Sequence, residues 1–235
     1  MPPLSPEQDA YGQILAAVAA GRDAQEIMER EDGRIYAGDP RDYLAPFRRW
    51  PAGERRSMRW VRGRVLDAGC AAGRVSLHLQ ERGHEVVAID ESPLAVGVAR
   101  QRGVRDARVL SLLDASPEAL GGPFGTVIVM RNNLGLGGDL DAAPRVLAHL
   151  AALAAPGGRL LTDSVHPARL DPKARGTGRD RYRVRWHEFA SPWFRYLMLA
   201  PEEVEAVVEG SPWRVRALVD DGVTPRYGIV LELRV

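Results

Sequence analysis

The residues best placed to do chemistry lie in the stretch 65–74, VLDAGCAAGR. An apolar run ends at Asp67, and Gly69 and Gly73 follow it at short spacing. Glycine permits positive φ angles and lets the backbone come close to a ligand. The pattern therefore predicts a strand that runs into a ligand-binding loop, of the kind that holds a nucleotide.

Three ligands fit such a loop in principle: a nucleoside triphosphate, a dinucleotide and S-adenosylmethionine. A phosphate loop needs Lys followed by Ser or Thr at the helix start, where this chain has Arg74 and Val75. A dinucleotide fingerprint needs the spacing G-x-G-x-x-G, which Ala71 and Ala72 do not supply. The carboxylate of Asp67 would repel a pyrophosphate but attract the sulfonium and ammonium groups of S-adenosylmethionine. The residues therefore favour S-adenosylmethionine.

Two further acids are expected at the ends of the next two strands. Asp90 ends the predicted second strand, where a carboxylate can accept hydrogen bonds from both ribose hydroxyls. Asp114 ends the predicted third strand, where a carboxylate can accept from an adenine amine. Strand ends of open α/β sheets border one ligand crevice. Each acid alone has a plainer explanation, as part of a turn, a helix start or a strand end.

At these residues the chain resembles the class I S-adenosylmethionine-dependent methyltransferase family. The stretch 65–73 resembles the family's motif D/E-x-G-x-G-x-G, with Ala71 in place of the middle glycine. VVAIDES resembles the ribose-binding segment, LLDA the adenine-binding segment, and PGGRLL the entry to the fifth strand. The resemblance implies a seven-stranded sheet whose last strand is antiparallel, and methyl transfer that leaves S-adenosylhomocysteine. The residues it places at the cofactor are Asp67, Gly69, Gly73, Asp90, Glu91, Ser92, Asp114, Ala115 and Arg131.

Candidate catalytic residues follow the predicted fourth and fifth strands. Asn132 and Asn133 carry carbonyl oxygens that could orient an amine or a hydroxyl of the methyl acceptor, although Asn and Gly together are also typical of a turn. His166 follows the fifth strand, where a general base could reach the acceptor, and His187 lies in a later hairpin. Either histidine could instead be structural. The D/N-P-P-Y/F motif of some amino methyltransferases is absent from the segment.

The sequence predicts no metal cofactor. The predicted fourth strand ends in Met130 and Arg131 rather than in an acid that could bind Mg²⁺. His78, His84 and His149 lie at no metal-ligand spacing. Methyl transfer from a sulfonium mainly requires positioning, with a base only where the acceptor must lose a proton.

A basic stretch, ARLDPKARGTGRDRYRVRW, covers residues 168–186. Alternation places Arg181, Arg183 and Arg185 on one face of a strand. The opposite face carries Tyr182 and Val184, followed by Trp186. The arginines could be a solvated outer face or could grip an anionic acceptor. RNA binding is a weaker alternative, because the net charge is only +1.

Alternating strands and helices after residue 60 predict an α/β fold with a doubly wound, mostly parallel sheet. Strands are expected at 61–69, 84–90, 107–114, 124–132 and 159–165, and two final strands at 213–222 and 226–235. Helices are expected at 74–83, 92–103, 141–158 and 201–210. A hairpin insertion is predicted over 170–199, with its turn at 190–192.

An N-terminal helical cap is predicted over residues 1–60, ahead of a methyltransferase domain over 61–235. Ser5, Pro6 and Gln8 predict a capped helix over 5–20, and a second helix is expected over 23–31. We expect this cap and the hairpin insertion to form a lid over the ligand crevice. Candidates for its inner lining are Tyr36, Tyr43 and Trp50.

Composition narrows the function classes. The chain has 235 residues, 45% of them apolar, and Cys70 is the only cysteine, so no internal disulfide can form. No apolar run is long enough to span a bilayer and no secretory signal is evident, so a cytoplasmic location is expected. The favoured function is methylation of an oxygen or nitrogen of a small, possibly anionic molecule. The alternatives are methylation of a peptide or RNA, an NAD-dependent oxidoreductase, and a non-catalytic protein that binds S-adenosylmethionine. The oligomeric state is left open.

Overall fold

A computed structural model describes residues 4–137, 140–170 and 180–234. These residues form two compact units, each assembled from separate parts of the chain. Unit 1 contains residues 4–49, 67–114 and 180–194. Unit 2 contains the described residues of 50–66, 115–170 and 195–234. The predicted cofactor loop thus belongs to unit 1, and the predicted catalytic residues belong to unit 2.

A mixed seven-stranded sheet confirms the predicted fold class. Its strand order is β11-β12-β7-β6-β3-β4-β5. Neighbouring pairs β4–β5 and β6–β7 are parallel, whereas β12 runs antiparallel to both β7 and β11. The strands are β3 (Val65–Ala68), β4 (Val86–Asp90), β5 (Ala107–Val109), β6 (Phe124–Val129), β7 (Ala154–Val165), β11 (Trp213–Val219) and β12 (Arg226–Leu233). The inner strands are buried on both faces, as their nearly unbroken apolar runs predict.

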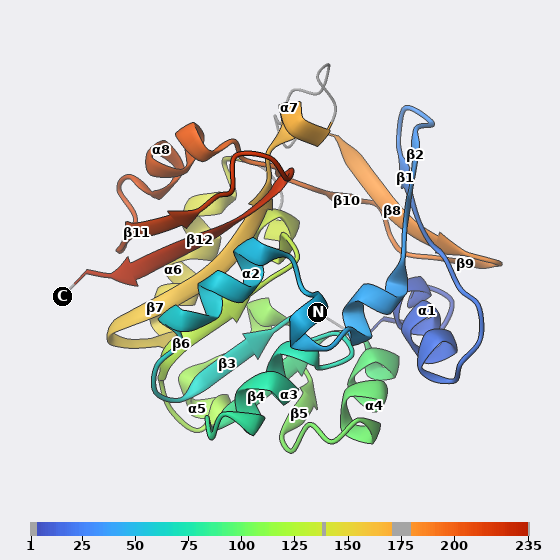
Figure 1. Cartoon of the computed structure of the whole chain (residues 1–235), viewed down its shortest axis with the longest axis horizontal. Helices are drawn as coiled ribbons and strands as arrows, with labels where there is room; N and C mark the ends of the chain where they lie inside the picture. Colours follow the sequence, from blue (N-terminus) through green and yellow to red (C-terminus); the bar gives the residue numbers. More distant parts are fainter. Residues whose placement is uncertain (1–3, 138–139, 171–179, 235) are drawn as a thin grey trace. The chain divides into compact units, whose positions relative to one another are not determined.

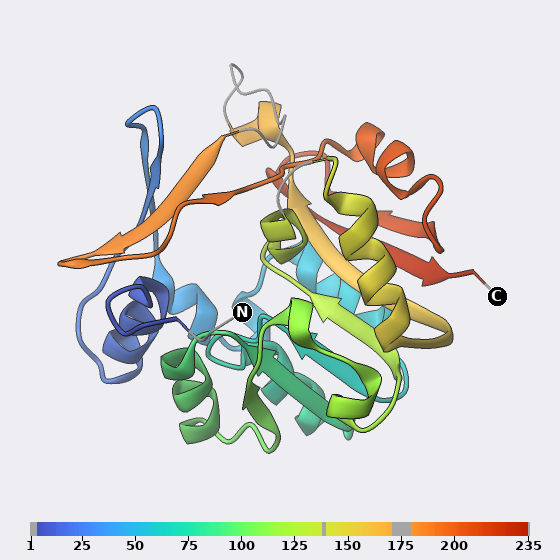
Figure 2. The same cartoon turned by 180° about the vertical axis from the view of Figure 1, so that it is seen from behind.

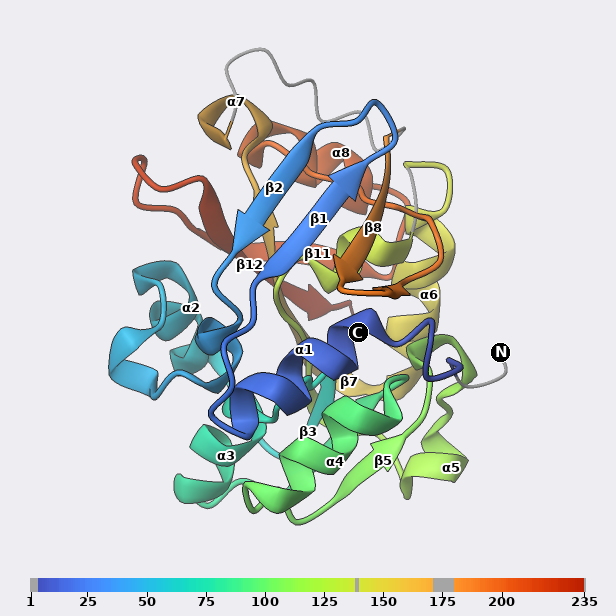
Figure 3. The same ribbon diagram turned by 90° about the vertical axis from the view of Figure 1, so that its right-hand side faces the viewer.

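Unit 1 also contains a second, small sheet. Figure 3 shows β1, β2 and β8 in this sheet, whose order is β10-β8-β1-β2, with β9 paired to β8. Its strands are β1 (Glu26–Arg30), β2 (Ile35–Gly38), β8 (Arg181–Trp186), β9 (Phe189–Ala190) and β10 (Phe194–Arg195). The helices of this unit are α1 (Ala10–Ala19), α3 (Arg74–Glu81) and α4 (Pro93–Gln101). The N-terminal segment and the later hairpin therefore belong to one sheet.

The predicted helix over 23–31 is wrong, because those residues form β1. Each strand neighbour supplies backbone hydrogen bonds: Met28 lies opposite Tyr36 of β2 on one side and opposite Val184 of β8 on the other. A segment this short is not stable as a helix by itself, so pairing with distant strands decides its structure. Glu26, the first residue of β1, accepts a hydrogen bond from the Tyr43 hydroxyl.

The first helix starts later than the sequence predicts. Ser5 and Gln8 form a turn, in which the backbone N–H of Gln8 donates to the Ser5 carbonyl. Helix α1 begins at Ala10. Asp9 is its N-cap and accepts from the Gly12 N–H at 2.9 Å. The predicted apolar face does pack: Ile14 and Leu15 are fully buried, against β8 and α4 respectively. Figure 3 shows α1 and α4 side by side.

Unit 2 holds the antiparallel side of the sheet. Figure 1 shows β7, β12 and β11 side by side, and Figure 2 shows α6 lying along β6 and β7. Its core includes Trp213, whose indole N–H donates to the Leu147 carbonyl at 2.8 Å. The helices of this unit are α2 (Ala52–Ser57), α5 (Pro117–Leu120), α6 (Ala143–Leu153), α7 (Pro167–Leu170) and α8 (Val204–Val208).

Two further expectations need correction. Strand β5 ends at Val109, and Asp114 ends a short 3₁₀ turn over Leu112–Asp114, because the chain leaves the sheet early. The hairpin turns at His187 and Glu188 rather than at 190–192, since Trp186 pairs with Phe189. His187 has a φ of +51°, which suits such a tight turn. The part of the predicted insertion at 171–179 lies outside the described residues.

Candidate active site

The loop after β3 has the backbone conformation that its glycines predict. Gly69 and Gly73 have φ values of +76° and +75°, and Ala71 adopts +50° despite its side chain. The N–H groups of Gly69 and Cys70 both donate to the Ile89 carbonyl of β4, at 2.8 and 3.0 Å. The loop is therefore fastened to the neighbouring strand. An ordinary residue in the left-handed region is uncommon, and such strain gathers at functional sites.

Asp67 is buried beneath this loop. Its side chain accepts from the Ser76 hydroxyl of α3 at 2.5 Å. Burial raises the pKa of Asp67 to about 6, and hydrogen bonds from Ser76 only partly oppose that shift. The carboxyl group thus joins β3 to α3. Direct contact of Asp67 with a ligand stays a prediction.

Asp90 connects the loop to the start of α4. One carboxylate oxygen accepts from the Ala71 N–H at 2.9 Å and the other accepts from the Ser92 N–H at 3.0 Å. Desolvation raises the pKa of Asp90 to about 6, and it likewise raises the pKa of Glu91. Ser92 is the N-cap of α4 and accepts from the Ala95 N–H at 2.9 Å. Strand β4 thus ends in a half-buried carboxylate with spare lone pairs.

The residues of this loop fit a cationic nucleoside ligand. Asp67 and Asp90 both have raised pKa values because they are desolvated, although the charge of Arg74 partly opposes the shift at Asp67. A positive charge placed beside them would favour their ionised forms. Asp114 is exposed at its turn, and Ala115 is buried. The arrangement agrees with an S-adenosylmethionine site at this strand end.

In unit 2, the segment after β6 forms a strained turn. Arg131 and Asn132 are consecutive left-handed residues, with φ values of +63° and +59°. Such residues cost on the order of 1–3 kcal/mol each and persist only where neighbours hold them. The Asn132 N–H donates to Asp163 of β7 at 2.8 Å, and its side-chain amide donates to the Leu197 carbonyl at 3.0 Å. The Tyr196 hydroxyl donates to the Arg131 carbonyl at 3.1 Å.

Sequence reasoning did not identify Asp163 and Arg226, which support this turn. Asp163 is buried, and the Arg226 guanidinium donates to its second carboxylate oxygen. Arg131 lies 3.9 Å from the buried carboxylate of Glu54. A signal was available, because an acid inside the apolar stretch RLLTDSV needs a partner when the strand is buried. The contact of Arg131 with the cofactor stays a prediction.

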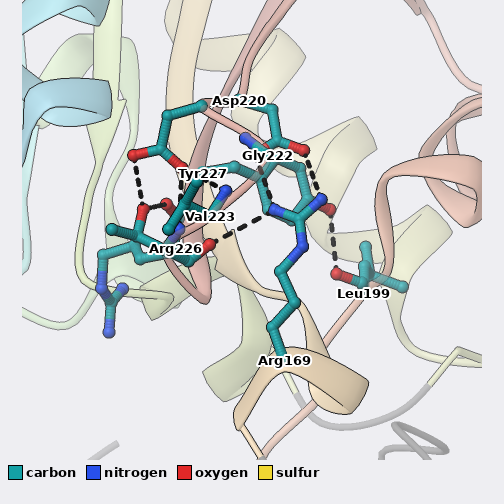
Figure 4. A network of polar contacts seen from close by, with 9 residues as sticks. Arg169, Leu199, Asp220, Gly222, Val223, Arg226 and Tyr227 are labelled. Atoms are coloured by element: carbon teal, nitrogen blue, oxygen red, sulfur yellow. Dashed lines mark hydrogen bonds and ion pairs between the residues drawn. The ribbon is translucent and has the colours of Figure 1, made fainter.

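His166 lies directly after β7, as predicted. The residue is half-buried, and its Nδ1 atom is buried without a hydrogen-bond partner among the described residues. The backbone N–H of His166 donates to the Pro225 carbonyl at 2.7 Å. Figure 4 shows that the next helix turn is fastened to the β11–β12 turn, because Arg169 makes two hydrogen bonds to Asp220 at 2.7 and 2.9 Å.

Arg183, Arg185 and Tyr43 of the predicted lid each contact another residue of unit 1. Arg183 and Arg185 both contact Glu29 of β1, at 2.9 and 3.3 Å. Tyr43 contacts Tyr11 edge to face, with ring centres 5.1 Å apart. A shallow hollow of about 960 Å³ lies on the small sheet of unit 1. His187 and Arg185 line it together with Trp186, Ile27, Glu29 and Ile35, and no predicted cofactor residue does.

Metal-binding clusters and membrane-spanning helices are both absent from the described residues. No group of three or more His, Cys, Asp or Glu side chains there is arranged to hold a metal ion. No helix in the same residues is both long and apolar enough to cross a bilayer. Independence from metals stays a prediction that an assay must test.

Comparisons with known proteins identify the family of this chain. A family model described as a methyltransferase domain matches residues 65–158. The ubiquinone biosynthesis O-methyltransferase of Xylella fastidiosa strain 9a5c is 32% identical over 184 residues, which cover 70% of this chain and 71% of that relative. The 2-heptyl-1-hydroxyquinolin-4(1H)-one methyltransferase of Mycobacteroides abscessus is 33% identical over 105 residues, which cover 40% of this chain and 46% of that relative. A S-adenosylmethionine-dependent methyltransferase from Bacteroides fragilis, solved with S-adenosyl-L-homocysteine, has the same fold: the TM-score is 0.87 at 24% identity, over 99% of this chain and 98% of that chain.

Proposed function

Because this chain belongs to the class I S-adenosylmethionine-dependent methyltransferase family, we propose that it methylates an oxygen atom of a small-molecule acceptor. The enzyme uses S-adenosylmethionine as its cofactor. When bound, this cofactor supplies an activated methyl group on a positively charged sulfur. The residues of this chain then have to bind the acceptor, orient it and receive its proton. Methylation of oxygen is supported by the names of the relatives, which are O-methyltransferases.

The observation that carries the proposal is the histidine after β7. A neutral hydroxyl is a weak nucleophile, and a base that removes its proton speeds the reaction. His166 is half-buried at a strand end, and its Nδ1 is not used by the fold among the described residues. Its ring thus remains available to accept a proton from the acceptor. We assign His166 as the general base.

Asn132 and Asn133 complete the proposed acceptor side. Asn132 is 1% exposed and donates its side-chain N–H to the fold, whereas Asn133 is half-buried. Asn133 is therefore the more accessible of the two for an acceptor. Asn132 contributes mainly by holding the strained turn beside it.

The N-terminal segment is proposed to cover the cofactor as a lid. It belongs to unit 1 with the cofactor loop and with the hairpin strand β8, and α1 packs on α4. Gly33 lies between β1 and β2, and Gly38 ends β2, so both are proposed as hinge positions. Amide hydrogen exchange across residues 5–50 should slow when S-adenosylmethionine is added. Unchanged exchange would contradict the lid.

Turnover of S-adenosylmethionine with a labelled methyl group tests the reaction. Matched acceptors that differ only in a phenolic hydroxyl or an aromatic amine should be compared, with and without excess EDTA. We expect methylation of the hydroxyl compounds and no effect of EDTA. Turnover of the amines alone would contradict oxygen methylation, and activity that Mg²⁺ or Zn²⁺ restores after EDTA would contradict metal independence.

A further inference from the structure

A chain of hydrogen bonds in unit 1 connects the first helix with the cofactor strand end. It begins at Asp9, the N-cap of α1. One carboxylate oxygen of Asp9 accepts from the Gly12 N–H at 2.9 Å. The other accepts from the hydroxyl of Ser92, at 2.7 Å. The caps of α1 and α4, which lie far apart in the sequence, therefore share one side-chain contact.

The same chain continues from Ser92 to the loop. The Ser92 hydroxyl accepts from the Ala95 N–H at 2.9 Å while its single proton goes to Asp9. The Ser92 N–H donates to Asp90, which in turn accepts from the Ala71 N–H. The orientation of Ser92 is thus fixed from both sides, and Ser92 holds one oxygen of Asp90.

Burial shows that Asp9 does more than cap a helix. Exposed carboxylates cap helix starts adequately: Asp39 is exposed and accepts from the Arg41 N–H at 2.9 Å. Asp9 is only 2% exposed, and burial raises its pKa. Desolvating a carboxylate is costly unless its hydrogen bonds compensate. One additional partner of the buried Asp9 carboxylate is the Ser92 hydroxyl.

Gly12 provides the space for this contact. A Cβ atom added at Gly12 would lie 2.3 Å from the Ser92 hydroxyl and within 2.5 Å of both Asp9 carboxylate oxygens. Gly12 stands inside α1, where glycine is less favourable than alanine by about 1 kcal/mol. Helix propensity thus favours alanine here, whereas the contact between Asp9 and Ser92 requires glycine.

We propose that Asp9 is a positioning residue for the cofactor. It holds Ser92, and through Ser92 it fixes Asp90 and the loop at Ala71 in the arrangement that binds the nucleoside. This inference rests on the proposed role of Asp90 toward the cofactor. It gives the N-terminal helix a role in cofactor affinity that requires no contact between the helix and the ligand.

Substitution of Asp9 by Ala tests the proposal in the full-length enzyme. Loss of one buried, charge-assisted contact should weaken binding of S-adenosylmethionine by about tenfold, as measured by calorimetry. The KM for S-adenosylmethionine should rise, while kcat at saturating cofactor and the KM for the acceptor stay close to wild type, because the proposed base lies in unit 2. Asp39→Ala is the matched control, since it removes a capping carboxylate that does not contact Ser92.

Two more variants separate positioning from simple stability. Gly12→Ala keeps both side chains but places a Cβ atom against their contact, so a purely structural role predicts lower stability with unchanged cofactor affinity. Positioning predicts weaker cofactor binding in that variant. In a double-mutant cycle, Asp9→Ala should have little further effect once Ser92→Ala is present.

The outcomes distinguish this proposal from the one on which it rests. If Asp9→Ala and Gly12→Ala bind S-adenosylmethionine within about twofold of wild type while Asp90→Ala binds weakly, Asp9 has no positioning role. If Asp90→Ala itself binds normally, the assignment of Asp90 is what fails. If Asp9→Ala does not fold, normal cofactor affinity in both Gly12→Ala and Ser92→Ala would overturn the proposal.

Discussion

The buried acids of the two units are stabilised in different ways. In unit 1, Asp67 and Asp90 accept hydrogen bonds from neutral donors, and desolvation raises the pKa of each to about 6. In unit 2, Asp163 is paired with the guanidinium of Arg226, and the partly exposed Asp220 is paired with that of Arg169. Unit 2 therefore supplies guanidinium partners for Asp163 and Asp220, whereas Asp67 and Asp90 are held by a hydroxyl and by backbone N–H groups.

This difference separates groups that support the fold from groups that serve a ligand. A buried carboxylate with an arginine beside it is already neutralised, and a second cation would gain little there. A desolvated carboxylate held only by neutral donors gains from any cation that binds beside it. The cofactor of this family carries such a cation. Substitution of acids in each unit and of the proposed base in unit 2 tests this distinction, and so does a change of pH.

The largest effect is expected on catalysis, from His166→Ala. Loss of a general base typically lowers the rate by 10²- to 10⁴-fold. Cofactor binding should remain near wild type, because the acids proposed to hold the cofactor lie in unit 1. Steady-state kinetics and calorimetry measure the two quantities. His149→Ala, in α6 of the same unit, is the control, and an equal loss of kcat in both variants would contradict the assignment of His166 as base.

The next effect is on stability, from Asp163→Ala. The substitution leaves the guanidinium of Arg226 without its carboxylate and removes the acceptor for the Asn132 N–H. Breaking a buried ion pair in this way costs about 3–5 kcal/mol of unfolding free energy. Urea denaturation measures that cost. Asp220→Ala breaks the pair with Arg169 at a more exposed place, and it should cost about 1 kcal/mol. Equal costs for the two variants would contradict the distinction.

A smaller effect on binding is expected from Asp90→Ala in unit 1. The variant loses the proposed acceptor for two ribose hydroxyls, so affinity for S-adenosylmethionine should fall by about 2–3 kcal/mol. Its folding should suffer less than in Asp163→Ala, because no buried cation is left unpaired. Calorimetry with the cofactor, alongside denaturation of the free enzyme, measures both. Unchanged affinity would show that this carboxylate serves only the loop and α4.

Sequence reasoning found the sheet and the cofactor loop because both depend on local signals. The apolar runs of β4, β6 and β7 and the glycines after β3 specify strand, turn and strand end within a few residues. The signals failed where distant pairing decides the outcome. Strand β1 forms only because β2 and β8 flank it, and β8 is about 150 residues away in the chain.

The same distinction between local signals and distant partners applies to the residues of the candidate site. Asp90 and His166 could be proposed from the sequence because the first ends a recognisable strand and the second follows one. Asp163 was missed because its partner Arg226 lies in another strand, and a buried acid has meaning only with that partner. Asp9 was missed for a similar reason. Its contact with Ser92 joins the starts of α1 and α4, and in the sequence one of these helices precedes the loop after β3 and the other follows it.

The smallest expected effect is a pH dependence that differs between the free and the cofactor-bound enzyme. In the free enzyme, the pKa values of Asp67 and Asp90 are raised to about 6 from 3.8 in the unfolded chain. The folded state therefore binds protons more tightly than the unfolded state between about pH 4 and 6. Across that window these two groups make the free enzyme less stable as the pH rises.

Cofactor binding should show the opposite trend. A cation beside Asp67 and Asp90 stabilises their ionised forms, so protonation below about pH 6 weakens its binding. We expect affinity for S-adenosylmethionine to be about tenfold lower at pH 5 than at pH 7.5, since each carboxyl is then mostly protonated. The rise in melting temperature on adding the cofactor should be larger at pH 7.5. Asp90→Asn removes one of the two titrating groups and should flatten the profile, whereas Asp220→Asn should leave it unchanged because that acid is paired with Arg169. An equal cofactor-induced shift at both pH values would mean that the acids of unit 1, like those of unit 2, serve the fold alone.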